Sequence, residues 1–430
     1  MNTVRKSLLI GATMLATASS ALSADTTIIH AGELLAMPGD KPMTDRSIII
    51  EDGRIVAVEK GFKAAGDGDT VIDLSSSFVM PGLMDMHVHL QGERDGARPG
   101  EAMKTSDADY AIKSVMYAKR TLMAGFTTVR NVGARSEQIY ALRKGVNRGW
   151  VDGPRIIASG GVAATGGHGD VDGMRPDLLE KYSSPTLCDG PYDCRRAVRH
   201  AIKYGADLIK ITATGGVLSD TATGTGQQMT DDELEEIMDT AHSLGRKVAA
   251  HAHEADGINA ALRAGVDSIE HGSYADDESI RLFKANGAYL VPTLIAGATV
   301  VRIAEDTPHV FSPAIREKAL RVGADMQGNF SKAVKGGVKI AFGTDAGVSR
   351  HGTNAEEAIL MEAGGMSPMA ILKSATVHGA DLIDMSDTLG TVEPGKFADI
   401  IAMDGSPLDD MEELLDVDFV MKGGKVYKNK

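Results

Sequence analysis

The chain has 430 residues and a formal net charge of −14 at pH 7, from 59 acidic and 45 basic residues. This excess of negative charge argues against nucleic acid or an anionic membrane surface as a partner. The length exceeds what one small core needs, and it allows a large barrel with a second, smaller domain. The 49 glycines suit the many tight turns of such a barrel.

Residues 1–24 have the pattern of a signal peptide. Arg5 and Lys6 precede an apolar stretch over residues 8–18, and small residues follow, with cleavage expected after Ala21 or Ala24. The apolar stretch is too short for a stable membrane span. We therefore expect an exported protein, periplasmic or secreted, with no membrane contact after signal removal. The alternative is a disordered or membrane-tethering N-terminus.

Short runs of β-type residues occupy both ends of the remaining chain. Two β-branched runs between residues 47 and 58 flank Asp52-Gly53, which is a hairpin signal. Residues 396–403 and 418–427 have the same character. We predict that 25–80 and 390–430 together form one small β-sandwich domain.

Residues 81–389 alternate between helix-type and strand-type periodicity. Eight strand-type runs are separated by helix-type runs, which predicts an α/β fold of the (β/α)8 TIM-type barrel class. The predicted strands are the run that ends at His87 and residues 127–130, 155–158, 207–211, 248–251, 268–271, 289–291 and 339–342.

Potential metal ligands lie at the ends of these strands. His87 and His89 end the first strand, and because they are two residues apart their side chains point to the same side. The active site of such a barrel lies at the C-terminal ends of its strands. The joint pattern therefore predicts a metal site at that face. The further candidates are Lys210 in the fourth strand, His251 and His253 at the end of the fifth, His271 at the end of the sixth and Asp345 after the eighth.

Six motifs distribute these residues along the chain: PGLMDMHVH at 81–89, ADLIK at 206–210, HAH at 251–253, SIEHG at 268–272, GTD at 343–345 and GKFAD at 395–399. Through them the chain resembles the amidohydrolase superfamily over essentially its whole mature length. Within that superfamily it is similar to the imidazolonepropionase-related group, which includes prolidase-like Xaa-Pro and Xaa-Arg/Lys dipeptidases and ochratoxin-type amidases.

The resemblance implies a centre with two divalent ions. His87, His89 and Asp345 would hold the more buried ion. Lys210, carboxylated by CO2, would bridge both ions, because a carbamate can ligate two cations and a free ammonium cannot. A lysine paired with an acidic residue is the alternative for Lys210.

His251 and His271 would hold the second ion. His253 is the alternative to His251 as a ligand, and otherwise it would contact the substrate or the metal-bound water. Zinc suits a histidine-rich set without thiolates, and manganese or cobalt could replace it.

The implied chemistry is hydrolysis of an amide or peptide bond in a dipeptide or N-acyl amino acid by a metal-bridging hydroxide. The enzyme would be a peptidase or amidase acting on a C–N bond, of the dipeptidase, carboxypeptidase or ochratoxin-type amidase kind. Two ions lower the pKa of a bridging water and polarise the carbonyl. Asp345 and His253 are the catalytic candidates, with Asp345 passing the proton to the leaving nitrogen.

Substrate contacts are also implied by the resemblance, at His168 and Tyr274, where His168 could stabilise the oxyanion. Arg350 and His351, which follow the eighth strand, are candidates for binding a substrate carboxylate. Ordinary loop residues are the alternative at all four positions. Because relatives are often multimers, we expect a homo-oligomer.

Two other functions compete with this hypothesis. A mononuclear cyclic-amide hydrolase or deaminase would use a glutamate near the fifth strand, where Glu254 lies, but Lys210 favours two metals. A non-catalytic metal-binding protein would need no proton shuttle, so Asp345 argues against it.

The chain has two cysteines, Cys188 and Cys194, which flank a short loop with Gly190-Pro191. An even count, the tight loop and the expected export favour a disulfide. Two free thiols are the alternative.

Overall fold

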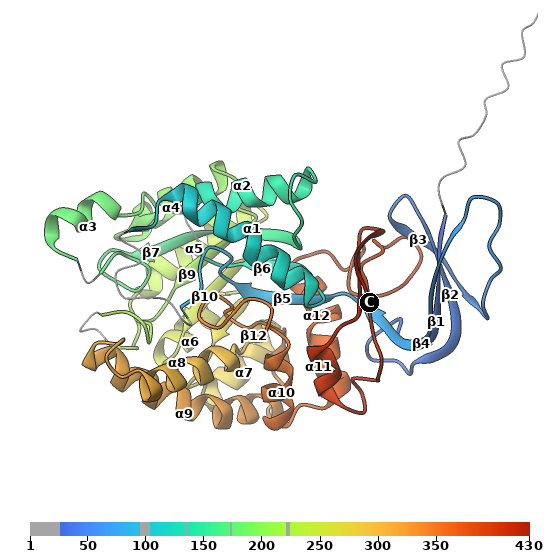
Figure 1. The fold of residues 1–430 in the computed structure, drawn as a ribbon. Coiled ribbons are helices and arrows are strands. Elements are labelled where there is room, and N and C mark those ends of the chain that lie inside the picture. The colour runs from blue at the N-terminus through green and yellow to red at the C-terminus, as the bar shows by residue number, and fades with distance from the viewer. Residues whose placement is uncertain (1–25, 95–103, 134–135, 173, 221–223) are drawn as a thin grey trace, which may run out of the picture.

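The computed structural model describes residues 26–94, 104–133, 136–172, 174–220 and 224–430. A barrel of strands and helices lies beside a smaller body that contains β1–β4 (Figure 1). The predicted signal peptide lies outside the described residues. Over the described ranges, none of the helices has the length and apolar character needed to cross a membrane.

Eight parallel strands form the barrel sheet, in the order β13-β12-β11-β10-β9-β7-β6-β5, and the short β8 (Leu187–Cys188) pairs with β7. All eight predicted strands are present, so the predicted fold class is confirmed. Their bounds are β5 Leu83–Val88, β6 Phe126–Asn131, β7 Arg155–Ala164, β9 Leu208–Thr212, β10 Val248–Ala252, β11 Ser268–His271, β12 Tyr289–Val291 and β13 Lys339–Ile340.

The barrel closes between its first strand and the segment that follows its last. The backbone nitrogen of Met86 donates to Phe342 O at 2.8 Å, and that of Asp345 donates to His87 O at 2.7 Å. Closure therefore places Asp345 directly beside the first histidine of β5.

Helices surround the strands (Figure 1). Their bounds are α1 Asp107–Met123, α2 Ser136–Asn147, α3 Pro176–Tyr182, α4 Pro191–Lys203, α5 Asp231–Ser243, α6 Ala255–Arg263, α7 Asp277–Asn286, α8 Leu294–Asp306, α9 Pro313–Lys335, α10 Glu356–Ala363, α11 Pro368–Ser374 and α12 Val377–Leu382, and a 3-10 helix, η2, spans Met411–Leu415.

Helix α9 has clear start signals. Ser312 is its N-cap, with the hydroxyl accepting a hydrogen bond from Ile315 N, and Pro313 occupies the first helical position. Helix α8 has a weaker signal, because most of its residues are buried and it lacks a wide polar face.

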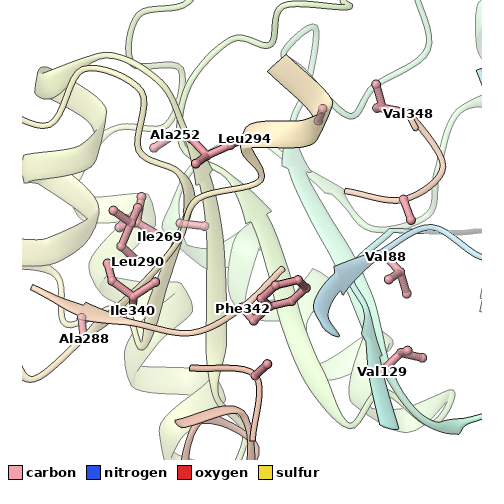
Figure 2. Packing of buried hydrophobic residues seen from close by; sticks show 14 of the residues in the cluster. Val88, Val129, Ala252, Ile269, Ala288, Leu290, Leu294, Ile340, Phe342 and Val348 are labelled. Atoms are coloured by element: carbon pink, nitrogen blue, oxygen red, sulfur yellow. The ribbon is translucent and has the colours of Figure 1, made fainter. Parts of the chain in front are cut away.

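The outward faces of the strands pack against the helices. Ile269, Leu290 and Ile340 are register neighbours on β11, β12 and β13, and all three are buried. Figure 2 shows these side chains grouped, with the ring of Phe342 between them and Val88. Burial of each aliphatic side chain contributes roughly 1.5–3 kcal/mol. This packing holds the strand ends that carry the polar residues.

Both chain ends form one seven-stranded sheet in the order β16-β15-β14-β4-β1-β2-β3. Its edge strand β3 also bonds the other end of the chain, because Ile55 N donates to Lys396 O at 2.9 Å, so the sheet folds back over its own apolar core. The limits 25–80 and 390–430 for this body stay a prediction. The strands are β1 Thr27–Leu34, β2 Met43–Glu51, β3 Arg54–Lys60, β4 Thr70–Pro81, β14 Ile400–Met403, β15 Phe419–Lys422 and β16 Lys425–Asn429.

Two local predictions are confirmed. Asp52 and Gly53 form the turn between β2 and β3, with φ of 48° and 75°. Cys188 and Cys194 form a disulfide with a Cα–Cα distance of 4.8 Å. The disulfide joins β8 to the first turn of α4.

Candidate metal centre and active site

Strand alternation directs the polar side chains into the barrel. On β10, His251 faces inward, and His253 follows just beyond the strand end, while Ala250 and Ala252 belong to the outer apolar core. A cavity of about 1400 Å³ opens at this end of the barrel. Its lining includes eight of the predicted site residues: His87, His89, His168, Lys210, His251, His253, His271 and Asp345.

His87, His89 and Asp345 form what we call the first cluster. One ligand atom from each lies within 4.8 Å of the others. Asp345 Oδ1 is 3.1 Å from His89 Nε2 and 3.5 Å from His87 Nε2. This buried oxygen accepts no hydrogen bond of good geometry from the described residues. Two imidazoles and a carboxylate that converge without bonding one another fit a divalent cation.

A buried ion pair supports the first cluster. His87 Nδ1 lies 2.7 Å from Glu270 Oε2, and Arg130 Nη2 donates to Glu270 Oε1 at 2.7 Å. Burial raises the pKa of Glu270, but Arg130 and His87 outweigh burial and lower the pKa below its usual range. An ionised carboxylate only accepts hydrogen bonds, so Nδ1 of His87 is the donor and Nε2 is left to face the cation.

Asp85 connects the first and last strands of the barrel beneath the cluster. Its Oδ1 accepts from His87 N at 3.0 Å, and its Oδ2 accepts from Thr344 Oγ1 at 2.6 Å and Asn354 Nδ2 at 2.7 Å. Burial raises the pKa of Asp85 to about 6. These bonds connect the backbone of His87, a predicted ligand, to Thr344, which directly precedes Asp345.

Three non-glycine residues at the site have left-handed backbones: His271, Thr293 and Asp345, with φ of 70°, 52° and 56°. Each such residue costs about 1–3 kcal/mol, and such strain gathers at functional sites. At His271 the backbone departs from strand alternation, so Glu270 and His271 both serve the same centre. Thr293 Oγ1 lies 2.7 Å from Nδ1 of His271.

His168, His251, His253 and His271 form the second cluster. The ring of His251 is the centre of the group, with centroids 4.3 Å from His168, 4.7 Å from His253 and 4.7 Å from His271. Burial lowers the pKa of His168 to about 4 and that of His253 to about 3. The imidazoles are therefore neutral, which is the form that binds cations. Both members of the 251/253 pair lie in this group, so the choice of ligand between them stays a prediction.

Lys210 is buried on β9 and lines the same cavity. Burial lowers its pKa to about 8, against the opposing effect of Glu270 and Asp345. His87 of the first cluster and His271 of the second have ring centroids 5.0 Å apart, so the two clusters are adjacent.

Four other candidates lie away from the cavity lining defined by the described residues. The hydroxyl of Tyr274 donates to Asp325 Oδ2 at 2.9 Å, and Glu254 accepts from Arg321 at 3.1 Å. His351 is buried, with Nε2 3.0 Å from a backbone carbonyl, and Arg350 is exposed. Burial lowers the pKa of His351 to about 4, and the backbone and ring of His89 also affect it, so His351 lies behind the first cluster. The structure does not bring the other three side chains together with the histidine clusters.

The supporting residues Arg130, Glu270 and Asp85 were not predicted. The one available signal was a charged residue inside a strand of the barrel, as with Arg130 in β6, because a buried charge needs a partner. The partner itself lies four barrel strands away and could not be named from the sequence.

A closed (β/α)8 barrel whose strand ends carry a largely buried His-His-Asp set defines a class of metal-dependent barrel enzymes. The family model described as "Amidohydrolase family" matches residues 78–427, and the chain belongs to this family.

Known proteins of the same group are similar to the chain over most of its length. Ochratoxinase of Aspergillus niger is 31% identical over 452 residues, covering 100% of this chain and 90% of the relative. A solved structure titled as a Xaa-Pro dipeptidase with bound methionine is 42% identical with a TM-score of 0.90, covering 94% of this chain and 100% of the other. Imidazolonepropionase of Fusobacterium nucleatum is 24% identical, covering 89% of this chain and 93% of the relative. The protein is therefore a hydrolase acting on amide bonds.

Proposed function

We propose that the protein is a binuclear metal-dependent hydrolase that releases the C-terminal amino acid from dipeptides or N-acyl amino acids. One observation carries the proposal: the His87-His89-Asp345 set, a second group of histidines and a buried lysine line a single cavity. A mononuclear site would have no use for Lys210 or for the second cluster. Glu254, which a deaminase would need at the site, is instead paired with Arg321.

The chain offers ligands for two divalent cations, and zinc suits them best. His87, His89 and Asp345 would hold one ion, and His271 with His251 or His253 would hold the other. Two cations would supply an activated water and a polarised carbonyl.

Lys210 would bridge the two ions as a carbamate. Its pKa of about 8 supports this role, because roughly a tenth of the side chain is then the neutral amine that reacts with CO2 at pH 7, far more than for an ordinary lysine. The two cations would then stabilise the carbamate, because their charge offsets the cost of burying this anion.

Asp345 would move the proton during cleavage. Its carboxylate lies beside the two histidines of the first cluster. Burial raises its pKa, but the interactions with His87, His89 and Lys210 outweigh burial and lower the pKa below its usual range. It is therefore ionised and can accept a proton from water and deliver it to the leaving nitrogen. His168 and His253 line the same cavity and would contact the scissile amide, where a ring N–H can stabilise the oxyanion.

The cavity supports a substrate with an apolar group. One wall is lined by apolar side chains of α8 and α9, including Val300, Ile303, Ile315, Val322 and Met326. The relatives are an ochratoxinase and a Xaa-Pro dipeptidase. We therefore place apolar N-acyl amino acids and dipeptides first among the substrates.

The deciding experiment measures amino acid released from Xaa-Pro, Xaa-Arg, Xaa-Lys and N-acyl-Phe compounds. Protein loaded with zinc in bicarbonate is compared with metal-stripped protein and with Lys210→Gln. Release that needs both metal and Lys210 supports the proposal. No release from any compound by protein that holds two zinc ions per chain would refute it.

We also propose export to the periplasm or medium, with the signal peptide removed, and assembly into a homo-oligomer. The pattern of residues 1–24 and the Cys188–Cys194 disulfide support export. N-terminal sequencing of the protein isolated from its host tests removal of the signal peptide, and the mass in solution tests the oligomeric state. A sequence that begins at Met1 would contradict export with cleavage, and the mass of a single chain would contradict assembly.

A further inference from the structure

Helix α9 binds two loops of the site through one of its faces. Lys318 Nζ donates to Gly216 O at 2.9 Å and to Ser219 O at 2.6 Å. Asn329 Nδ2 donates to Ser273 O at 2.7 Å. The two side chains are 11 residues apart (329 − 318), about three helical turns, so they project from the same face.

Each of the two serines contacts one histidine of the second cluster. Ser219 Oγ is hydrogen-bonded to Nδ1 of His168, and Ser273 Oγ lies 2.8 Å from Nδ1 of His253. Both serines are buried. Because a bond at one ring nitrogen sets the role of the other, each histidine is left with Nε2 for the cavity.

Burial of Lys318 strengthens the link. Its side chain is 8% exposed, and a buried ammonium is costly unless hydrogen bonds satisfy it. The carbonyl groups of the loop at 216–219 supply those bonds. Ser312, at the start of α9, also donates to Asp220 Oδ1 at 2.8 Å, so the helix holds this loop at two points.

We propose that Lys318 and Asn329 are positioning residues that set the ring orientation of two substrate-facing histidines. Helix α9, which also forms the apolar wall of the cavity, thereby couples the shape of the substrate pocket to the polar groups of the site. The inference rests on the proposed function for the role of the histidines. The first relay is Lys318, Ser219 and His168, and the second relay is Asn329, Ser273 and His253.

The first relay gives the sharper test, because His168 is not a predicted metal ligand. Lys318→Met and Ser219→Ala are made in the full chain, loaded with zinc, and assayed on the compound that the wild type cleaves fastest. We expect kcat/KM to fall roughly 10- to 100-fold, as for other lost orienting partners, with zinc content unchanged. Lys335→Met, on an exposed lysine of the same helix, is the matched control and should stay within about twofold.

The double variant separates positioning from general damage. If Lys318 acts through Ser219, the double variant loses no more than the worse single variant. Ser219→Thr keeps the hydroxyl and should recover most of the activity. Losses that multiply in the double variant, or zinc lost together with activity, would overturn the proposal. If Ser219→Ala does not fold, Ser219→Cys removes the strong hydrogen bond at nearly constant volume.

Crystal structures of the same variants test the inference apart from the activity. The His168 ring should turn away from its wild-type orientation in Ser219→Ala and in Lys318→Met. An unmoved ring in both variants would refute the relay. A wild-type protein that cleaves no compound, with a ring that does move, would refute the proposed function alone.

Discussion

The two clusters of the site are held by different kinds of chemistry. The first cluster rests on ionised groups inside the barrel, with Glu270 and Arg130 forming a buried pair behind His87. The second cluster rests on neutral hydroxyl groups from strand ends and loops, such as Ser219 and Ser273. We therefore expect the first cluster to be the rigid half of the site and the second cluster to be the half whose position depends on α9.

Asp345→Asn should have the largest effect on activity. The amide keeps one ligand oxygen but cannot accept and deliver a proton, so kcat should fall about 10²- to 10⁴-fold with metal still bound. Steady-state kinetics and metal analysis of the same sample measure both quantities. Turnover near the wild-type rate would show that the first cluster only binds metal.

Glu270→Gln should destabilise the rigid half of the site, which contains the first cluster. It leaves the charge of Arg130 buried without its partner, which costs about 3–5 kcal/mol of unfolding free energy. Metal affinity should also fall 10- to 100-fold, since His87 loses its orienting group. Urea unfolding and zinc titration check the two effects. Glu235→Gln, on the exposed face of α5, is the control and should change stability by less than about 0.5 kcal/mol.

Replacing both Cys188 and Cys194 by serine should lower stability by about 2–4 kcal/mol. The bond closes a short loop beside β7, next to Ala163 and Leu187 of the cavity wall. The first cluster lies on other strands, so its metal affinity should not change. Thermal unfolding measures the loss of stability, and zinc titration measures the metal affinity of the first cluster. A weaker zinc affinity would show that the first cluster is not independent of the region around the disulfide.

His242→Gln should have the smallest effect, away from both clusters. The hydrogen bond from His242 on α5 to Asp267 raises the pKa of the imidazole above its ordinary 6.5. The stability it contributes is full below pH 6.5 and is lost as the pH rises through the raised folded-state pKa. Unfolding free energies measured from pH 5 to 9 should therefore fall less steeply for the variant just above pH 6.5. Parallel curves would contradict this assignment.

The strands and the location of the candidate ligands could be predicted because their signals are local. Residues two apart on a strand point to the same face, so His87 and His89 could be paired from the sequence. The turns that follow β-type runs placed His271 and Asp345 at strand ends. Position in a βα repeat then placed Lys210 at the same face. These inferences need no knowledge of distant contacts.

The supporting groups could not be predicted because they depend on contacts between distant strands. Arg130 on β6 meets Glu270 on β11 across the barrel interior, and neither residue carries a mark of that pairing. Helix α8 lacks a polar face, so its periodicity is weak. Tyr274 follows the motif closely, yet its hydroxyl is bound to Asp325, which lies on a helix whose position no local pattern reveals.

The connection between the small β-sheet body and the barrel constrains the order in which the chain can fold. Strand β4 runs to Pro81 and passes through Gly82 directly into β5, and Gly82 N donates to Asp399 O at 2.9 Å. A side chain at Gly82 would collide with Thr127, so the crossing has room only for glycine. During synthesis, β4 meets β1 almost at once, but it gains β14 only after nearly the entire barrel has left the ribosome. Strand β4, which leads directly into the strand that presents His87, therefore completes its pairing last, and β5 itself closes onto residues 342–345 only after that segment has been made.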